Sequence, residues 1–367
     1  MKNEAQEVRI VKRRNLVFSK NLTYYRLKKG LNKKELAKQA GVTPASITHY
    51  EKGERVPESM DVIKKLALAL EVKVTDFMVF HTGDLVFSFG DFRKNQSLSK
   101  SDQELVRAQT ERYFTRFFNV IEVLGESCLP SSPELSVLPL SENVEENAEA
   151  MRRYLGLSLT GPVGNLTCCL ENRGFLVFAY DPELCDFFGM NGTVNGRPFI
   201  VCNGAHSPER TRLTIARELA RILFFWPEGM EDKEAEKLVT ATGGAFLFPK
   251  TDVIRELGPR RASLTMKELN IVGEEYGISP SLIVKRAEIC HVLSKERAKR
   301  IYQVLAQKGW FSGKQPERIN REKSELFEQL VFRAVSDDEI SIQKGGELLN
   351  KPCEYIAEQC IPIQDSE

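Results

Sequence analysis

The stretch ELAKQAGVTPASITHYEKGERVP, residues 35–57, decides the fold of the N-terminal region. It places a small residue, Ala37, inside a first short helix and a glycine, Gly41, at the turn that follows. Thr43 is a typical N-cap residue for a second helix, and Pro44 stands at its first position, where a missing N–H costs nothing. The spacing therefore predicts two short helices joined by a tight turn, which is a helix-turn-helix.

Further helices are expected on both sides of this pair. The spacing of apolar residues predicts one over Phe18–Lys29 and another over Lys33–Ala40, each followed by a glycine that ends it. A capped helix over Met60–Leu70 and a short helix near Thr75–Phe80 follow. Residues 15–80 are thus predicted to form a five-helix unit. Its small core is expected to include Leu36, Val42, Ile47 and Leu66.

Charge is distributed unequally along the chain. The net charge of the whole sequence is +1, but residues 1–80 contain 17 Lys and Arg against 9 Asp and Glu. The remaining residues contain 35 Lys and Arg against 42 Asp and Glu. A basic N-terminal region on a mildly acidic body favours a polyanionic partner, although a solvated basic surface has the same composition.

The second helix of the pair is expected to enter the major groove of double-stranded DNA. Hydroxyl and imidazole groups can bond to base edges, and small apolar groups can contact a thymine methyl group. Three residues, Asn32, Lys33 and Lys52, are predicted to contact phosphates, which set register and affinity but carry no sequence information. The predicted base-reading residues are Thr43, Pro44, Ala45, Ser46, Thr48 and His49.

These residues resemble the XRE (Cro/C1-type) repressor family, which implies a lambda-repressor-like domain that binds operator DNA. The resemblance covers residues 18–78. In that family the equivalents of Arg26 and Glu51 pair structurally, which implies that both belong to the scaffold. A homodimer is expected, because single helix-turn-helix units bind weakly and operators mirror protein symmetry. The family pattern is filled here by Arg26, Gly30, Leu31, Glu35, Leu36, Ala37, Gly41, Val42, Ile47, Glu51, Gly53, Arg55 and Pro57.

Length and composition limit what the rest of the chain can be. At 367 residues it is expected to form two or three domains, with an ordinary hydrophobic content of 42%. No apolar run long enough to span a membrane and no signal-peptide pattern is present, so a cytoplasmic location is expected. The eight cysteines form no CxxC pair and are expected to be reduced thiols. Cys202 and His206 are spaced C-x3-H, but without a second pair nearby they are not expected to bind zinc.

Composition divides the middle of the chain into two segments. Residues 81–142 are predicted to contain a strand near Leu85–Phe89, a long helix over Ser101–Leu124 and a Pro- and Ser-rich interdomain linker over 126–142. Residues 143–312 alternate between helical and strand patterns, which predicts a mainly helical α+β domain with a small sheet. Its predicted elements are helices at 144–155, 210–225 and 232–248 and strands at 174–180 and 197–202.

The predicted helix over 210–225 contains the pentad Arg217-Glu218-Leu219-Ala220-Arg221. In zinc peptidases the pattern H-E-x-x-H places two imidazoles one helical turn apart, so that both reach one metal ion. The surroundings resemble the ImmA/IrrE family of metallopeptidase-like proteins, which implies a zincin-like fold for residues 143–312. The resemblance also implies that Glu236 corresponds to the third, carboxylate ligand. The similar blocks are Gly196–Ile200, Arg210–Ala216, Glu236–Val239, Gly244–Pro249, Tyr276–Ser279 and Lys285–Ala287.

Both histidines of the peptidase motif are arginine here. Arginine stays protonated and offers only donors, so it cannot ligate zinc, and we expect no catalytic residue, no metal and no cofactor. The retained carboxylates, Glu218 and Glu236, would repel each other without a cation. Arg217 and Arg221 are therefore predicted to fill the metal position and pair with them. The alternative is a pair of solvated arginines on an exposed helix face.

Three roles are open for residues 143–312. As a pseudo-peptidase, the domain would sense a small molecule or peptide in its cleft and alter DNA binding. As a scaffold, it would bind a partner protein or dimerise the chain. The intact family implies an active peptidase that cleaves a repressor, but the arginines argue against this role. Residues 322–360 are predicted to form a pair of short helices around Gly345 and Gly346, used for packing, dimer contact or DNA contact.

Overall fold

A computed structural model describes residues 2–77, 85–90, 98–180, 187–310 and 319–361. The chain divides into two compact units, which we describe separately. The first unit consists of Met1–Leu85, Leu98–Glu126 and Leu330–Glu367. The second unit consists of Val86–Ser97 and Ser127–Gln329. No helix among the described residues is both long and apolar enough to cross a membrane.

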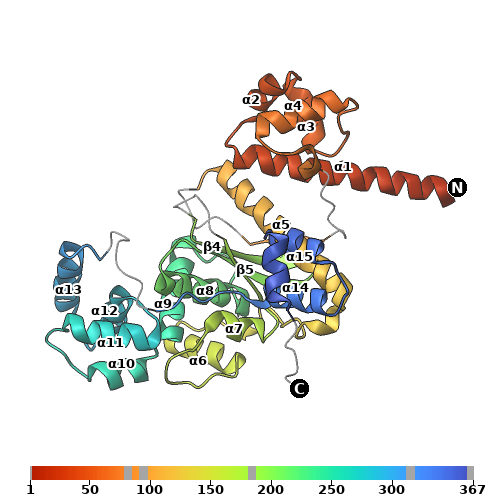
Figure 1. Cartoon of the computed structure of the whole chain (residues 1–367). Helices are drawn as coiled ribbons and strands as arrows, with labels where there is room; N and C mark the ends of the chain where they lie inside the picture. The colour runs from red at the N-terminus through yellow and green to blue at the C-terminus, as the bar shows by residue number, and fades with distance from the viewer. Residues whose placement is uncertain (1, 78–84, 91–97, 181–186, 311–318, 362–367) are drawn as a thin grey trace, which may run out of the picture. The chain divides into compact units, whose positions relative to one another are not determined.

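The N-terminal part of the first unit is a cluster of helices. Helices α2 (Lys33–Ala40), α3 (Pro44–Glu51) and α4 (Met60–Leu70) gather beside α1 (Lys2–Lys28), and a 3-10 helix, η1 (Val74–Phe77), follows (Figure 1). The predicted bounds of α2 and α4 are confirmed. The N-caps of α2, α3 and α4 are the predicted residues Asn32, Thr43 and Ser59.

Two predicted boundaries in this cluster were wrong. Helix α1 begins at Lys2 rather than at Phe18. The apolar spacing of Phe18, Leu22 and Tyr25 set the predicted start, but the preceding residues are mostly strong helix formers without Gly or Pro, so the helix extends over them. The expected helix near Thr75–Phe80 is a 3-10 helix that starts at Val74, and residues 78–80 lie outside the described part of the chain.

A small apolar core holds these helices together. Leu36 and Leu66 are fully buried, as predicted, and so is Ile47 of α3, whereas Val42 is only partly buried. Phe18 of α1 lies at the centre, with its ring 5.2 Å from that of Phe77. The core therefore fixes one face of α3 and leaves its opposite face outside. Its buried residues are Phe18, Leu22, Leu36, Ala37, Ala40, Ile47, Tyr50, Ile63, Leu66, Ala67, Leu70 and Phe77.

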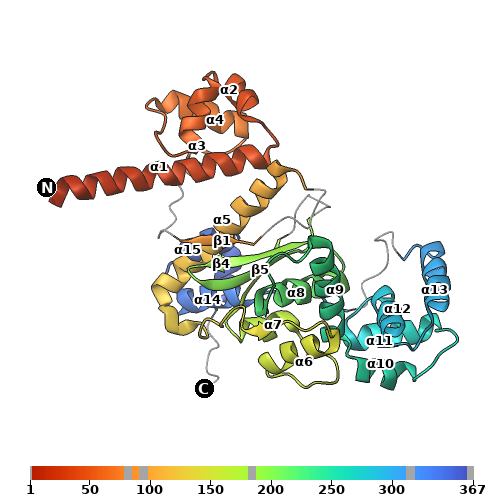
Figure 2. The same cartoon turned by 180° about the vertical axis from the view of Figure 1, so that it is seen from behind.

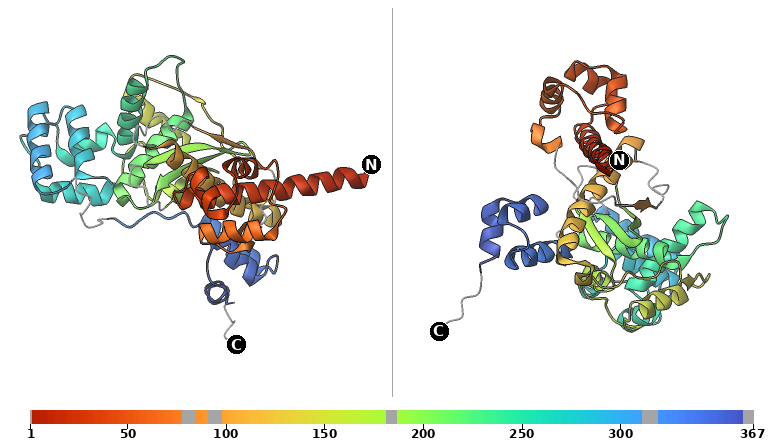
Figure 3. Two further views of the ribbon diagram at one scale, coloured as in Figure 1. Left: turned by 90° about the horizontal axis from the view of Figure 1, so that it is seen from above. Right: turned by 90° about the vertical axis from the view of Figure 1, so that its right-hand side faces the viewer.

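The first unit also contains α5 (Lys100–Leu124) and the C-terminal helices α15 (Ile342–Leu349) and α16 (Cys353–Gln359). Before them, α14 (Leu326–Ser336) brings the C-terminal segment to three helices, where a pair was predicted. The C-terminal helices, drawn in blue, lie beside α5 (Figure 3), and Arg116 donates to the carbonyl of Leu348 at 2.9 Å. Gly345 lies inside α15. A glycine fits there because a Cβ would stand 2.9 Å from a methyl group of Val335.

The second unit contains a four-stranded sheet in the order β1-β4-β5-β3. Strands β1 (Phe87–Phe89) and β4 (Gly189–Val194) pair antiparallel, β4 pairs antiparallel with β5 (Arg197–Asn203), and β3 (Leu176–Tyr180) runs parallel to β5. Strand β4 was not predicted, because its sequence GMNGTV contains two glycines and an asparagine, which are rare in strands.

The segment predicted as an interdomain linker is partly packed into the second unit. Strand β2 (Leu138–Pro139) pairs parallel with β6 (Phe224–Phe225), and Ser136 donates its N–H to the carbonyl of Ile222 at 2.9 Å. Three leucines of this segment pack against the main core of the unit. Proline and serine content predicted an open linker, but the leucines between them provide enough apolar surface to dock it. These leucines are Leu135, Leu138 and Leu140.

Helices cover this sheet and extend beyond it. Helix α8 (Pro208–Leu223) packs on β4 and β5 and against α9 (Asp232–Leu247), as Figure 2 shows. The predicted α+β class with a small sheet agrees with this architecture. The remaining helices are α6 (Val144–Tyr154), α7 (Leu166–Glu171), α10 (Lys250–Leu257), α11 (Met266–Tyr276), α12 (Pro280–Ile289) and α13 (Lys295–Gln307).

Candidate functional site

Helix α3 presents the predicted base-reading residues on its outer face. Ile47 and Tyr50 are buried on the inner face and fix the rotation of the helix. Among the six predicted residues, Ser46 and Thr48 are half-buried. The exposed ones are Thr43, Pro44, Ala45 and His49.

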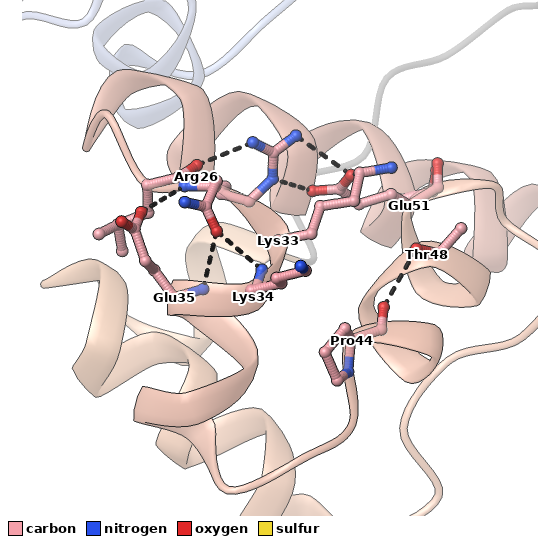
Figure 4. A network of polar contacts seen from close by, with 10 residues as sticks. Arg26, Lys33, Lys34, Glu35, Pro44, Thr48 and Glu51 are labelled. Atoms are coloured by element: carbon pink, nitrogen blue, oxygen red, sulfur yellow. Dashed lines mark hydrogen bonds and ion pairs between the residues drawn. The ribbon is translucent and has the colours of Figure 1, made fainter.

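Several polar groups on this face are hydrogen-bonded within the helix. Thr43 caps α3 by accepting the N–H of Ser46 at 3.1 Å, and the two hydroxyls lie 2.9 Å apart. Thr48 donates to the carbonyl of Pro44 at 3.1 Å (Figure 4). These hydroxyls retain acceptor capacity, so they can accept from a base edge without breaking the helix.

His49 contacts a carboxylate that the sequence analysis did not single out. Its Nδ1 bonds to the side chain of Glu54, and this hydrogen bond is the main cause that lowers the pKa of Glu54. Both side chains are about half exposed. Lys52, one of the predicted phosphate contacts, lies 3.8 Å from the same carboxylate and is 63% exposed, so it remains accessible to DNA.

The other predicted phosphate contacts lie at the start of α2. Asn32 acts as the helix cap, since its Oδ1 accepts from the N–H groups of Lys34 and Glu35 at 2.9 and 3.0 Å (Figure 4). Glu35 in turn accepts the N–H of Asn32 at 2.7 Å. The Nζ of Lys33 lies 3.1 Å from Glu51. Asn32 thus has a structural role, and the capping bonds leave only its amide nitrogen for a phosphate.

Arg26 and Glu51 form the scaffold pair that the resemblance implied. The Nε of Arg26 bonds to Glu51, its Nη2 donates to the same carboxylate at 3.2 Å, and its Nη1 donates to the carbonyl of Leu31 at 2.8 Å (Figure 4). The two side chains are 7% and 4% exposed. The pair therefore ties α1 to the end of α3 and is too buried to contact DNA.

Arg55 is a candidate contact that was not predicted as one. It is exposed, and its guanidinium lies 5.6 Å from the ring centre of Tyr50. Its Nη2 lies 3.4 Å from the hydroxyl of Ser46. This arrangement places a permanent cation beside the face of α3 that carries the predicted base-reading residues. The available signal was its position two residues after Gly53, in a basic region.

In the second unit the four residues that were compared with a peptidase motif lie together. Arg217 and Arg221 are one turn apart on α8, and both bond to the carboxylate of Glu236 on α9. Arg221 also bonds to Glu218. The second oxygen of Glu218 accepts from the amide of Asn191 on β4 at 2.7 Å. We call Arg217, Glu218, Arg221 and Glu236 the ion-pair cluster.

The ion-pair cluster is mostly shielded from solvent. Arg217 and Glu236 are 21% and 29% exposed, and Arg221 and Glu218 are 14% and 8% exposed. The alternative prediction of two solvated arginines on an open helix face was therefore wrong. The Nε groups of both arginines are buried and find no hydrogen-bond acceptor among the described residues. The cluster is neutral in formal charge but incompletely bonded.

The donors at the ion-pair cluster do not fit a zinc ion, because guanidinium groups have no lone pair to offer. Among the described residues, no group of three or more His, Cys, Asp or Glu side chains could hold a metal. Cys202 is 1% exposed, and burial raises the pKa of its thiol to about 12, so it stays protonated. His206 lies three residues from the end of β5, with Nε2 3.5 Å from Asn203.

Comparison with known proteins identifies one part of the chain. Residues 22–77 match the family model described as helix-turn-helix, the XRE-type domain. No curated protein and no solved structure matched the chain. The matched residues run from α1 through the short 3-10 helix after α4 and include all of α3.

Proposed function

We propose, from the helix-turn-helix at residues 22–77, that the chain is a transcriptional regulator that binds double-stranded operator DNA. The second unit, in this proposal, is a pseudo-peptidase that binds a ligand or a partner and does not hydrolyse peptides. The observation that carries the proposal is the family match, which covers a helix whose outer face presents polar side chains.

Charge and geometry together support DNA binding by the first unit. The surplus of Lys and Arg over Asp and Glu in residues 1–80 is eight. Lys52 and Arg55 are exposed at the end of α3 and just after it, where cations can reach phosphates on either side of a groove. In this proposal Thr48 and His49 read base edges, and Lys33, Lys52 and Arg55 contact the backbone.

The ion-pair cluster supports a non-catalytic second unit. Two side chains at positions i and i+4 of α8 converge on one carboxylate of α9, which is the geometry that H-E-x-x-H sites use for a metal. Here both side chains are guanidinium groups. The carboxylate of Glu218, which would polarise a water in a peptidase, is held by Arg221 and Asn191. This arrangement favours descent from an ImmA/IrrE-like peptidase that has exchanged its metal for fixed cations.

Sensor and scaffold roles remain alternatives for the second unit, and two measurements separate them. A rise in the melting temperature of the chain on addition of small-molecule pools or peptides would support the sensor role. Sizing chromatography of the pure chain detects the expected homodimer. An active peptidase would lose activity on chelation or with Glu218→Gln, and we expect no activity to lose.

Selection of bound sequences from a random DNA pool at stated salt tests the DNA-binding proposal. We expect one enriched operator, and loss of about tenfold to several hundredfold in operator affinity for Thr48→Ala with His49→Ala. Thr75→Ala, an exposed threonine on the 3-10 helix, is the matched control and should bind normally. Absence of any enriched sequence, or unchanged affinity of the double variant, would refute the assignment of α3.

A further inference from the structure

We propose that the edge of β4 is a binding site for an extended segment of a partner protein, and that β1 fills this edge as an intramolecular ligand. The inference rests on the partner-binding role proposed above for the second unit and names the class of partner. An unpaired sheet edge offers backbone N–H and C=O groups, to which an extended peptide adds as a further strand.

Strand β1 is a short addition to the outer end of the sheet. It contributes three residues, in the register Phe87 opposite Val194 and Phe89 opposite Gly192. The pairing continues on both sides, since Val86 accepts the N–H of Asn195 at 2.9 Å and Gly90 donates to the carbonyl of Asn191 at 2.8 Å. Without β1, the outer backbone groups of β4 would be open to another strand.

The chain sequence on either side of β1 belongs to the other unit. Met1–Leu85 and Leu98–Glu126 are part of the first unit, whereas Val86–Ser97 is part of the second. Strand β1 therefore lies in the segment of sequence that joins two parts of the first unit. In the structure it is the edge strand of the sheet of the second unit. Because β1 occupies the edge of β4, its sequence shows which residues can pair there.

Two aromatic side chains anchor β1. The rings of Phe87 and Phe89 stack 5.6 Å apart. Both meet the ring of Phe199 on β5 edge-on, at 6.5 and 5.9 Å. Because side chains alternate along a strand, aromatic groups two residues apart lie on the same face. A peptide for this edge therefore needs the pattern aromatic-x-aromatic.

Two glycines set the close approach of the strands. A Cβ at Gly192 of β4 would stand 2.4 Å from the carbonyl oxygen of Ser88. A Cβ at Gly90 would stand 2.6 Å from Oδ1 of Asn191. The edge thus leaves no room for a side chain directly after the second aromatic residue. The preferred ligand is aromatic-x-aromatic-Gly, as in the FSFG sequence of β1.

The site borders the ion-pair cluster. Asn191 accepts the N–H of Gly90 through its carbonyl and donates from its side chain to Glu218 at 2.7 Å. A strand that replaces β1 would therefore bond to the residue that holds Glu218. Strand β1 itself is only partly covered: Val86 is 70% exposed and Ser88 is exposed, so the strand is tied mainly by its two aromatic rings and its backbone.

A labelled peptide with the sequence of residues 84–91, DLVFSFGD, tests the proposal by fluorescence anisotropy. The full chain is used as wild type and as Phe87→Ala with Phe89→Ala, which removes the anchors of the resident strand. We expect the variant to bind the peptide at least tenfold more tightly than wild type. Ser88→Pro is a second variant, which blocks strand pairing and leaves the core intact because Ser88 is exposed.

Two control peptides need no change to the protein. One replaces both phenylalanines by alanine, and the other replaces the glycine at the position of Gly90 by valine; each should bind at least tenfold more weakly. Equal binding of all three peptides, or no gain for either folded variant over wild type, would overturn the proposal. Operator affinity is measured on the same preparations, so a failed peptide assay with intact DNA binding refutes this inference alone.

Discussion

The two units each contain an arginine–glutamate cluster between helices, and the clusters differ in how completely they are bonded. In the first unit Arg26 bonds to Glu51 through Nε and Nη2, donates from Nη1 to the carbonyl of Leu31, and is 7% exposed. In the second unit Arg221 bonds to both Glu218 and Glu236, and Arg217 bonds to Glu236. Their buried Nε groups have no acceptor among the described residues, and the side chains of Arg217 and Arg221 are 21% and 14% exposed.

In the proposed function, this difference separates a structural pair from a site that has exchanged its metal for arginines. A buried ion pair stabilises a fold most when its donors are bonded, because an unpaired buried donor costs about 1–3 kcal/mol. A site inherited from another chemistry keeps the positions of its side chains after their bonding partner has changed. Under the function proposed above, the ion-pair cluster is a site of the second kind, because Arg217 and Arg221, at positions i and i+4 of α8, converge on one carboxylate of α9.

The largest expected effect is in the first cluster. Arg26→Met should lower the free energy of unfolding of the first unit by about 3–5 kcal/mol, because the buried carboxylate of Glu51 loses its bidentate partner. Urea denaturation followed by circular dichroism measures this change. Lys29→Met, which removes an exposed pair with Glu71, is the control and should change little. A loss below about 1 kcal/mol for Arg26→Met would show that the pair is not structural.

In the second cluster we expect smaller and unequal losses. Arg221→Met should cost about 2–3 kcal/mol, because Arg221 bonds to both carboxylates. Arg217→Met should cost about 1 kcal/mol, because among the described residues Arg217 forms an ion pair with Glu236 alone. Replacing all four members by Met and Gln should recover most of the loss, since no charge then remains unpaired. Equal losses for the two single variants would contradict this ranking.

A pH-dependent effect is expected at Glu171 of α7. Burial raises the pKa of its carboxyl to about 7 from 4.5, and Ser324 donates to it. The folded state keeps this proton after the unfolded state has lost it, so wild-type stability falls as pH rises from 4.5 to about 7. Glu171→Gln removes this loss and should be more stable than wild type at pH 8 by on the order of 1 kcal/mol, but not at pH 4. A difference in the free energy of unfolding between the two proteins that stays constant from pH 4 to pH 8 would contradict this prediction.

The smallest effect is expected at an ordinary surface pair. Glu149 and Arg153 on α6 lie 3.0 Å apart at positions i and i+4, and their side chains are 46% and 64% exposed. Glu149→Gln should change the free energy of unfolding by less than about 0.5 kcal/mol, as measured by the same denaturation. A loss as large as that of Arg221→Met would mean that the ion-pair cluster contributes no more to stability than an exposed surface pair.

The sequence predicted the helix-turn-helix well because local rules determine it. Caps at Asn32, Thr43 and Ser59 fix the starts of α2, α3 and α4, and the glycine at position 41 fixes the end of α2. The start of α1 was missed because no residue in its polar first half signals a boundary. Contacts such as His49 with Glu54 depend on side-chain direction after a turn, which spacing does not specify.

The second unit was predicted less completely. The convergence of Arg217 and Arg221 on Glu236 followed from helical periodicity and the resemblance to a peptidase motif. Strand β4 and its pairing with β1 could not be predicted in this way. Strand β4 is stabilised by its neighbours and by the space that Gly192 leaves, and its own strand propensity is low. Asn191, the β4 residue that holds Glu218, was missed for the same reason.

The most direct test of the account compares the zinc content of wild type with that of Arg217→His plus Arg221→His. Both proteins are incubated with zinc, dialysed and analysed by elemental analysis, with circular dichroism to check folding. Guanidinium groups that stand in place of a metal predict no stoichiometric zinc in wild type and about one zinc ion per chain in the double variant. Stoichiometric zinc in wild type, or none in a folded double variant, would contradict it.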